Sequence, residues 1–133
     1  MTKLHYSDMS NEQLANAFIE LSLCQADAIG LGKQRKMREL FDELRALKEA
    51  LRARGLEARK VLVPLLSYSP RSPSVFQDQA AQVRLNAARE LLAVLPEQAR
   101  ATLEDLASRG PSAQSGRAGM CLQFLDDGVF KPT

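Results

Sequence analysis

Apolar residues recur every three or four positions along most of this chain, which is the spacing of one face of an α-helix. Between Met37 and Leu51 that spacing is unbroken, and charged residues fill most of the positions between. Oppositely charged residues four apart, such as Arg45 and Glu49, can pair on the wet side of such a helix. The apolar positions of this stripe, all expected to face the core, are Met37, Leu40, Phe41, Leu44, Leu47 and Leu51.

Residues that favour helix ends divide the chain into further helices. Ser10 and Gln13 have the spacing of a capping box, in which each side chain accepts a hydrogen bond from the other residue's backbone N–H. Gly30, Gly32 and Gly55 mark helix stops, because glycine readily adopts the left-handed conformation found there. We therefore predict helices after Ser10, across the Met37–Leu51 stripe, and over residues 56–68 (kinked at Pro64), 77–95, 96–110 and 115–127.

The predicted helix over residues 77–95 has the widest apolar arc. Alanine, valine and leucine residues occupy two adjoining faces of it rather than one. Such an arc is typical of a helix that is covered on several sides. We expect it to be the best-buried helix, with Leu91 and Leu92 both in the core.

Composition supports an all-helical fold. The chain is rich in Leu, Ala, Arg, Glu and Gln, which are good helix formers, and it has no Trp, five Phe and two Tyr. A length of 133 residues fits one domain. We predict a single all-α domain over residues 1–133, with about six helices in stacked antiparallel pairs. Residues 1–9 are expected to form an N-terminal tail, and residues 68–76 an exposed loop rich in Ser and Pro.

The segment from residue 57 to residue 95 resembles a HEAT repeat. Its first helix carries Pro64 among apolar residues, and its second contains the run Val83-Arg84-Leu85-Asn86-Ala87-Ala88-Arg89-Glu90-Leu91, similar to the family pattern VRxxAAxxL. The resemblance to HEAT-like and armadillo-like proteins implies that the helix pairs stack into a right-handed superhelix. It also implies a structural ion pair or a helix-cap contact for Arg84.

The whole chain also resembles a small bacterial family of HEAT-like proteins to which no activity is assigned. Three segments carry this resemblance, namely Met9 to Leu14, Val83 to Leu92, and Ala118 to Pro132 with its Leu-Asp-Asp-Gly-Val-Phe-Lys-Pro ending. The resemblance therefore implies a fold and not an activity.

Positive charge is concentrated in one part of the chain. The net charge is only +2, but residues 33–60 contain ten Lys or Arg against five Asp or Glu. A run of charges is usually an ordinary solvated helix start, but basic residues at a helix N-terminus oppose the helix dipole, which keeps a binding role open. The candidate residues for binding an acidic partner are Lys33, Arg35, Lys36 and Arg38.

Residues with catalytic or metal-binding chemistry are sparse. His5 is the only histidine, and the two cysteines, Cys24 and Cys121, belong to no CxxC pair. An apolar setting makes Cys121 an expected buried and unreactive thiol. Asp126 and Asp127 stand unfavourably at a helix C-terminus, where Arg117 or Lys131 could neutralise them or where they could mark a functional spot. We predict no metal and no cofactor.

Segments that would place the chain in or across a membrane are not apparent in the sequence. No apolar run approaches the roughly 18 residues of a membrane span, and the first residues lack the apolar core of a signal peptide. The expected location is the cytoplasm.

Gly116 and Gly119, three apart in the last predicted helix, are expected to allow close helix packing.

Three classes of function remain open on these grounds. The leading hypothesis is a non-catalytic module that binds another protein, because stacked helix pairs present extended surfaces to macromolecules. The alternative is a nucleic-acid-binding module that uses the basic residues between Lys33 and Lys60. A small enzyme that relies on carboxylates or on Cys121 is the third and least favoured hypothesis.

Overall fold

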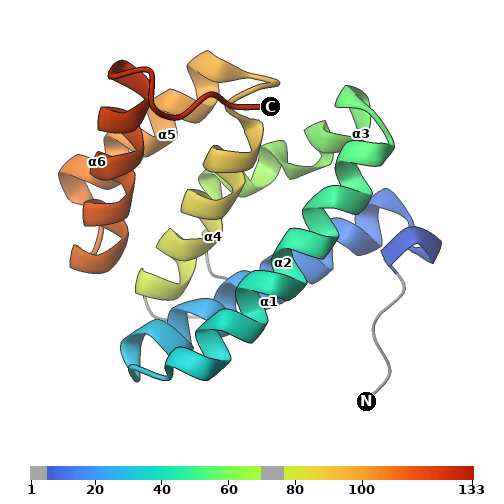
Figure 1. Cartoon of the computed structure of the whole chain (residues 1–133), viewed down its shortest axis with the longest axis horizontal. Coiled ribbons are helices and arrows are strands. Elements are labelled where there is room, and N and C mark those ends of the chain that lie inside the picture. Colours follow the sequence, from blue (N-terminus) through green and yellow to red (C-terminus); the bar gives the residue numbers. More distant parts are fainter. Residues whose placement is uncertain (1–5, 70–76) are drawn as a thin grey trace.

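The computed structural model of the chain describes residues 6–69 and 77–133, and within these ranges the protein is all-helical (Figure 1). Six α-helices and two 3₁₀ helices follow one another, and no strand occurs among the described residues. This confirms the predicted all-α fold of about six helices. The elements are η1 (Tyr6–Asp8), α1 (Asn11–Gly30), α2 (Gln34–Ala53), α3 (Leu56–Arg59), η2 (Lys60–Ser67), α4 (Gln77–Leu91), α5 (Pro96–Arg109) and α6 (Ser112–Asp126).

The start of the fold is more ordered than a tail. The Ser10–Gln13 capping box is present, with the Gln13 backbone N–H 3.1 Å from the Ser10 hydroxyl and the Ser10 N–H 2.8 Å from the Gln13 amide oxygen. Before it, η1 packs on the core through Tyr6, which is buried and donates a 2.6 Å hydrogen bond to Glu43. The prediction of a tail therefore does not hold for residues 6–9. Residues 1–5, including His5, lie outside the described residues.

Helices α1 and α2 form an antiparallel pair (Figure 1). Leu40, Leu44, Leu47 and Leu51 of α2 are buried, as the stripe predicts. Phe41 is 55% exposed, so its predicted place in the core is wrong. Each helical residue turns the side chain by about 100°, which places Phe41 on a stripe next to the leucines and not on it.

Pro64 changes the third helix more than a kink would. The segment begins as α3, a single α-helical turn, and continues from Lys60 as the 3₁₀ helix η2. In an α-helix the Pro64 ring would meet the carbonyl of Lys60, four residues earlier, so the α-helical pattern ends there. Tyr68 is the C-cap residue of η2, and Arg84 of α4 donates to its carbonyl at 3.4 Å. This is the helix-cap contact that the family resemblance implies for Arg84.

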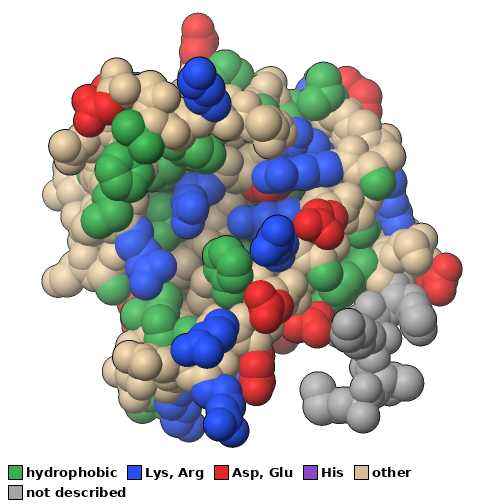
Figure 2. All heavy atoms as spheres, viewed as in Figure 1, with side chains coloured by type: hydrophobic (Ala, Val, Ile, Leu, Met, Phe, Trp, Pro, Cys, Tyr) green, Lys and Arg blue, Asp and Glu red, His purple; other side chains and the backbone are tan. Residues whose placement is uncertain are grey.

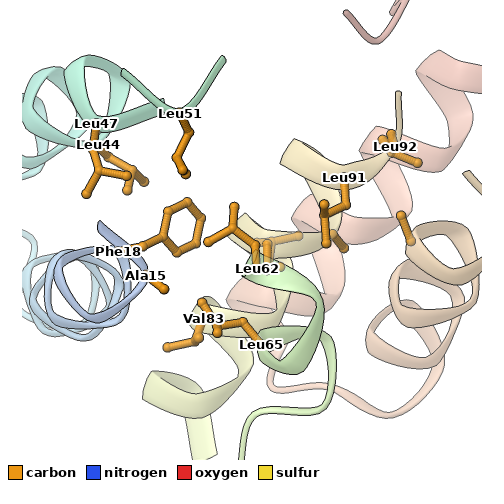
Figure 3. Close-up of a cluster of buried hydrophobic side chains, with 14 of the residues drawn as sticks. Ala15, Phe18, Leu44, Leu47, Leu51, Leu62, Leu65, Val83, Leu91 and Leu92 are labelled. Carbon is orange, nitrogen blue, oxygen red and sulfur yellow. The ribbon is translucent and has the colours of Figure 1, made fainter. Parts of the chain in front are cut away.

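Helix α4 is the centre of the molecule. It contacts α1, η2, α5 and α6, and ten of its fifteen residues are buried. Leu91 and Leu92 are 0% and 4% exposed, which confirms the predicted burial of both. Figure 3 shows them at one end of a cluster in which Phe18 lies between the α2 leucines and Leu62 of η2. The helix itself ends at Leu91, four residues before the predicted end.

A buried polar network, which the sequence pattern did not reveal, joins α1, α4 and α6. The Asn86 amide donates to Ser22 at 2.9 Å and to Gln25 at 2.7 Å, both on α1. The Gln82 amide donates to Asn86 at 3.1 Å and accepts at 3.0 Å from Gln114 of α6. Buried polar groups need such partners because burying an unpaired one is costly. The three helices are thus joined by directional bonds as well as by apolar packing.

Helices α5 and α6 pack against each other and cover the other side of α4. Pro96 opens α5 at its first turn, as expected for a proline there. The predicted role of Gly116 and Gly119 is wrong, because a Cβ at either position would meet no heavy atom within 4 Å. No helix among residues 6–69 and 77–133 is long and apolar enough to span a membrane. The loop predicted at residues 68–76 falls largely within residues 70–76, which are not described.

Candidate partner-binding face

The four basic residues that the sequence singled out lie at the start of α2. Lys33 is the N-cap residue of α2, and no acidic residue occurs in the first turn. Lys33 and Lys36 border a shallow hollow of about 200 Å³ beside Leu31, which is 68% exposed. The four side chains are exposed and form no ion pair within the described part of the chain. The role of these four residues, Lys33, Arg35, Lys36 and Arg38, in binding stays a prediction.

A second basic region lies on the face formed by α2, α4 and α6, which we call the inner face. Figure 2 shows Lys and Arg side chains gathered across the middle of this face, with hydrophobic side chains over α6 beside them. Two hollows open onto it, each of about 310 Å³. Arg89 of α4 lines both hollows and so stands between them.

The α2–α4 hollow takes its lining from the stripe of α2 that lies next to the buried leucines. Phe41, Arg45, Lys48 and Arg52 follow one another at steps of four, three and four, so they share one side of the helix. Leu44, Glu49 and Arg89 complete the lining. This spacing is present in the sequence, but the pattern predicts Phe41 in the core stripe and only Arg45 among these cations on the wet side of the helix.

A buried carboxylate anchors the wall of this hollow. The Glu90 side chain is 1% exposed and accepts two 2.8 Å hydrogen bonds from Arg52, one on each carboxylate oxygen. Arg59 of α3, itself buried, lies 3.2 Å from the same carboxylate and donates at 2.7 Å to the Glu90 carbonyl. The hydrogen bonds from Arg52 to Glu90 raise the pKa of Arg52 above its ordinary value. The Arg52–Glu90 pair thus fixes the distance between α2 and α4.

Lys48 is the most perturbed group of the hollow. Its side chain is half-buried, and loss of solvent is the main reason that its pKa is lowered to about 8. Glu90 opposes this shift, whereas the nearby charges of Arg89 and Arg52 add to it. Lys48 therefore holds its positive charge at a cost that a bound anion would reduce.

The α4–α6 hollow combines positive charge with exposed apolar side chains. Met120, Phe124 and Val129 are 56%, 42% and 72% exposed, respectively. They line the hollow together with Cys121, Phe130 and the cations Arg89 and Arg117. Large apolar side chains that cluster around a hollow in a small protein are typical of a binding surface.

The structure describes Cys121 and the Asp126–Asp127 pair, which the sequence offers as functional candidates, whereas His5 lies outside the described residues. Cys121 is buried, and burial raises the pKa of its thiol, which disfavours the reactive thiolate. Asp126 pairs with Arg100 of α5, with 3.0 Å between Nη1 and Oδ1, and not with the partners that the sequence suggested. Among the described residues, no group of three His, Cys, Asp or Glu side chains could hold a metal ion.

Comparison with known proteins places this all-helical chain in a family. Residues 12–126 match the domain of unknown function DUF2019, and the chain belongs to that family. The crystal structure of the protein RPA1889 from Rhodopseudomonas palustris CGA009 is similar to this chain, with 35% sequence identity and a TM-score of 0.85. The match covers 98% of this chain and 100% of that one. No curated protein matches the chain.

Proposed function

We propose that this domain is a non-catalytic protein-interaction module that binds an acidic, partly apolar segment of a partner protein in the α4–α6 hollow. The supporting observation is the composition of that hollow. Three exposed apolar side chains, Met120, Phe124 and Val129, lie beside the two cations Arg89 and Arg117. An acidic segment with one or two apolar residues is complementary to it in both charge and polarity.

The architecture agrees with this proposal. Proteins built from stacked helix pairs use the face made by one helix of each pair to bind macromolecules. The HEAT-like superhelix that the sequence resemblance implies belongs to the same proposal. Under it, α2, α4 and α6 are the second helices of three pairs, and the inner face is the binding face.

Selection from a random peptide library, displayed on phage, tests the proposal with no need to know the partner. We expect the enriched peptides to be acidic and to carry apolar residues. Phe124→Ser should abolish the enrichment, because it removes an apolar contact from the hollow. Leu56→Ser removes a leucine that is 59% exposed and lines neither hollow, so it serves as the matched control and should leave enrichment unchanged.

Two results would refute the proposal. One is an absence of enrichment above a control protein of equal charge. The other is enrichment that survives Phe124→Ser but is lost when Arg35 and Lys36 are both replaced by Gln. That second result would assign binding to the start of α2.

Nucleic-acid binding is the second candidate, and the cations gathered on the inner face favour it. Much of the positive charge near α3 is already used inside the protein, however. Arg54 donates to the Asn11 side chain at 2.9 Å and to two carbonyls of η1, and Arg59 is buried against Glu90. Contacts to phosphates make affinity fall steeply with salt. A duplex that shows no binding even at low salt would exclude this function.

A further inference from the structure

The α2–α4 hollow contains more positive charge than its own carboxylates neutralise. Arg45 lies 3.6 Å from Glu49, and Arg52 is held by Glu90. Lys48 and Arg89 have no ion pair and no hydrogen bond within the described residues. Two uncompensated cations therefore line one hollow, one from α2 and one from α4.

The position of Lys48 makes its charge unfavourable, whereas Arg89 is exposed. Lys48 is half-buried, so water screens it less than it screens a surface lysine. The charge of Arg89 is close enough to help lower the pKa of Lys48. An anion between the two would replace this repulsion with two attractive contacts.

Size and charge indicate which anion fits. A carboxylate carries a single negative charge and would leave one of the two cations uncompensated. A phosphate monoester carries a charge close to −2 at neutral pH and three strong acceptor oxygens. A volume of about 310 Å³ is at the small end of ligand pockets, which suits a small molecule better than a large cofactor.

We propose that the α2–α4 hollow binds a small phosphate monoester, with its dianionic group between Lys48 and Arg89 and its organic part against Phe41. Phe41 is an exposed aromatic ring in the lining of the same hollow, so it offers an apolar contact to whatever carries the phosphate. Arg45 at the exposed edge adds a third donor, because its one ion pair within residues 6–69 and 77–133 is with an exposed glutamate. This ligand site is separate from the proposed partner segment and shares only Arg89 with it.

Calorimetric titration of the whole protein with phenyl phosphate, a monoester with an aromatic ring, tests the proposal. We expect saturable binding that is stronger than for inorganic phosphate, which has no ring, and stronger than for benzoate, which has a ring and one charge. Lys48→Gln and Arg89→Gln should each weaken binding about tenfold or more, since each removes a charge-assisted contact. Arg109→Gln removes an 80% exposed cation of α5 that lines neither hollow, and it should leave the affinity unchanged.

A second measurement locates the site without a variant. In the ¹H–¹³C spectrum, phenyl phosphate should raise the pKa of the Lys48 side chain, because an anion favours the charged form. The proposal is overturned if phenyl phosphate does not bind saturably, if benzoate binds as tightly, or if Arg109→Gln weakens binding as much as Arg89→Gln. Equal affinity for inorganic phosphate would overturn the choice of a monoester as the ligand and the proposed contact between Phe41 and its organic part.

Discussion

Replacing Glu90 with glutamine should destabilise the protein more than any exposed substitution. The change removes the charge that Arg52 and Arg59 share and leaves the guanidinium of Arg59 buried without a counter-charge. Removing one partner of a buried ion pair costs about 3–5 kcal/mol. Arg59 keeps two carbonyl contacts, at 2.7 Å to Glu90 and at 2.9 Å to Thr133, which limit the cost to that range.

Urea unfolding followed by circular dichroism measures this cost. At a slope of about 1.5 kcal/mol/M, the expected loss lowers the urea midpoint by roughly 2–3 M. A small domain has a free energy of unfolding of about 5–15 kcal/mol, so the variant should remain folded only if the wild type is well above the lower limit.

The matched control is Glu57→Gln. The Glu57 carboxylate also pairs with a cation, Lys60 at 2.9 Å, but its side chain is 87% exposed. Exposed pairs contribute only about 0–1 kcal/mol, so the midpoint should hardly move. The double variant Arg59→Met, Glu90→Leu should recover most of the loss, because apolar residues can replace a buried pair. The reasoning is refuted if Glu90→Gln costs no more than Glu57→Gln.

Three further predictions follow from the hollow, the polar network and the exposed aromatic ring. Lys48 should titrate near pH 8 in ¹H–¹³C spectra, and titration near 10.5 would contradict the described burial. Because the pKa of Lys48 is lower in the folded protein than in the unfolded chain, the free energy of unfolding should rise between about pH 8 and pH 10. Asn86→Ala should lower the free energy of unfolding by about 1–3 kcal/mol in urea, since it leaves buried partners unsatisfied. Asn16→Ala, at an exposed position, should stay within about 0.5 kcal/mol, and equal costs would argue against the network. Phe41→Ser should change the free energy of unfolding by less than about 1 kcal/mol, while the buried Phe18→Ala should cost about 3–5 kcal/mol; the reverse order would return Phe41 to the core.

Helix content and the core could be predicted from local pattern because both depend on residues close together in the chain. The leucine stripe of α2, the capping box at Ser10 and the wide arc of α4 each needed only a few turns of sequence. Pro64 was recognised as a disturbance, but its effect depended on the clash with the Lys60 carbonyl, which turned the rest of the segment into a 3₁₀ helix.

The inner face could not be predicted in the same way. Lys48 and Arg89 are far apart in the sequence, and nothing in either helix alone indicates that both line one hollow. The same holds for Glu90, which follows Arg89 in a helix of balanced charge and is the buried partner of two arginines from other elements. The exposed position of Phe41 was missed because an aromatic residue next to a leucine stripe matches the core pattern equally well.

The polar network between α1, α4 and α6 restricts how these helices can slide along one another. A core of Leu and Ala side chains alone tolerates neighbouring registers, because one aliphatic contact resembles the next. A shift of α4 by one helical turn is about 5.4 Å, which would separate Asn86 from both Ser22 and Gln25. The observed register therefore brings these hydrogen-bond partners together, and a neighbouring register does not. That register fixes Arg89 at the same height between α2 and α6 in every molecule.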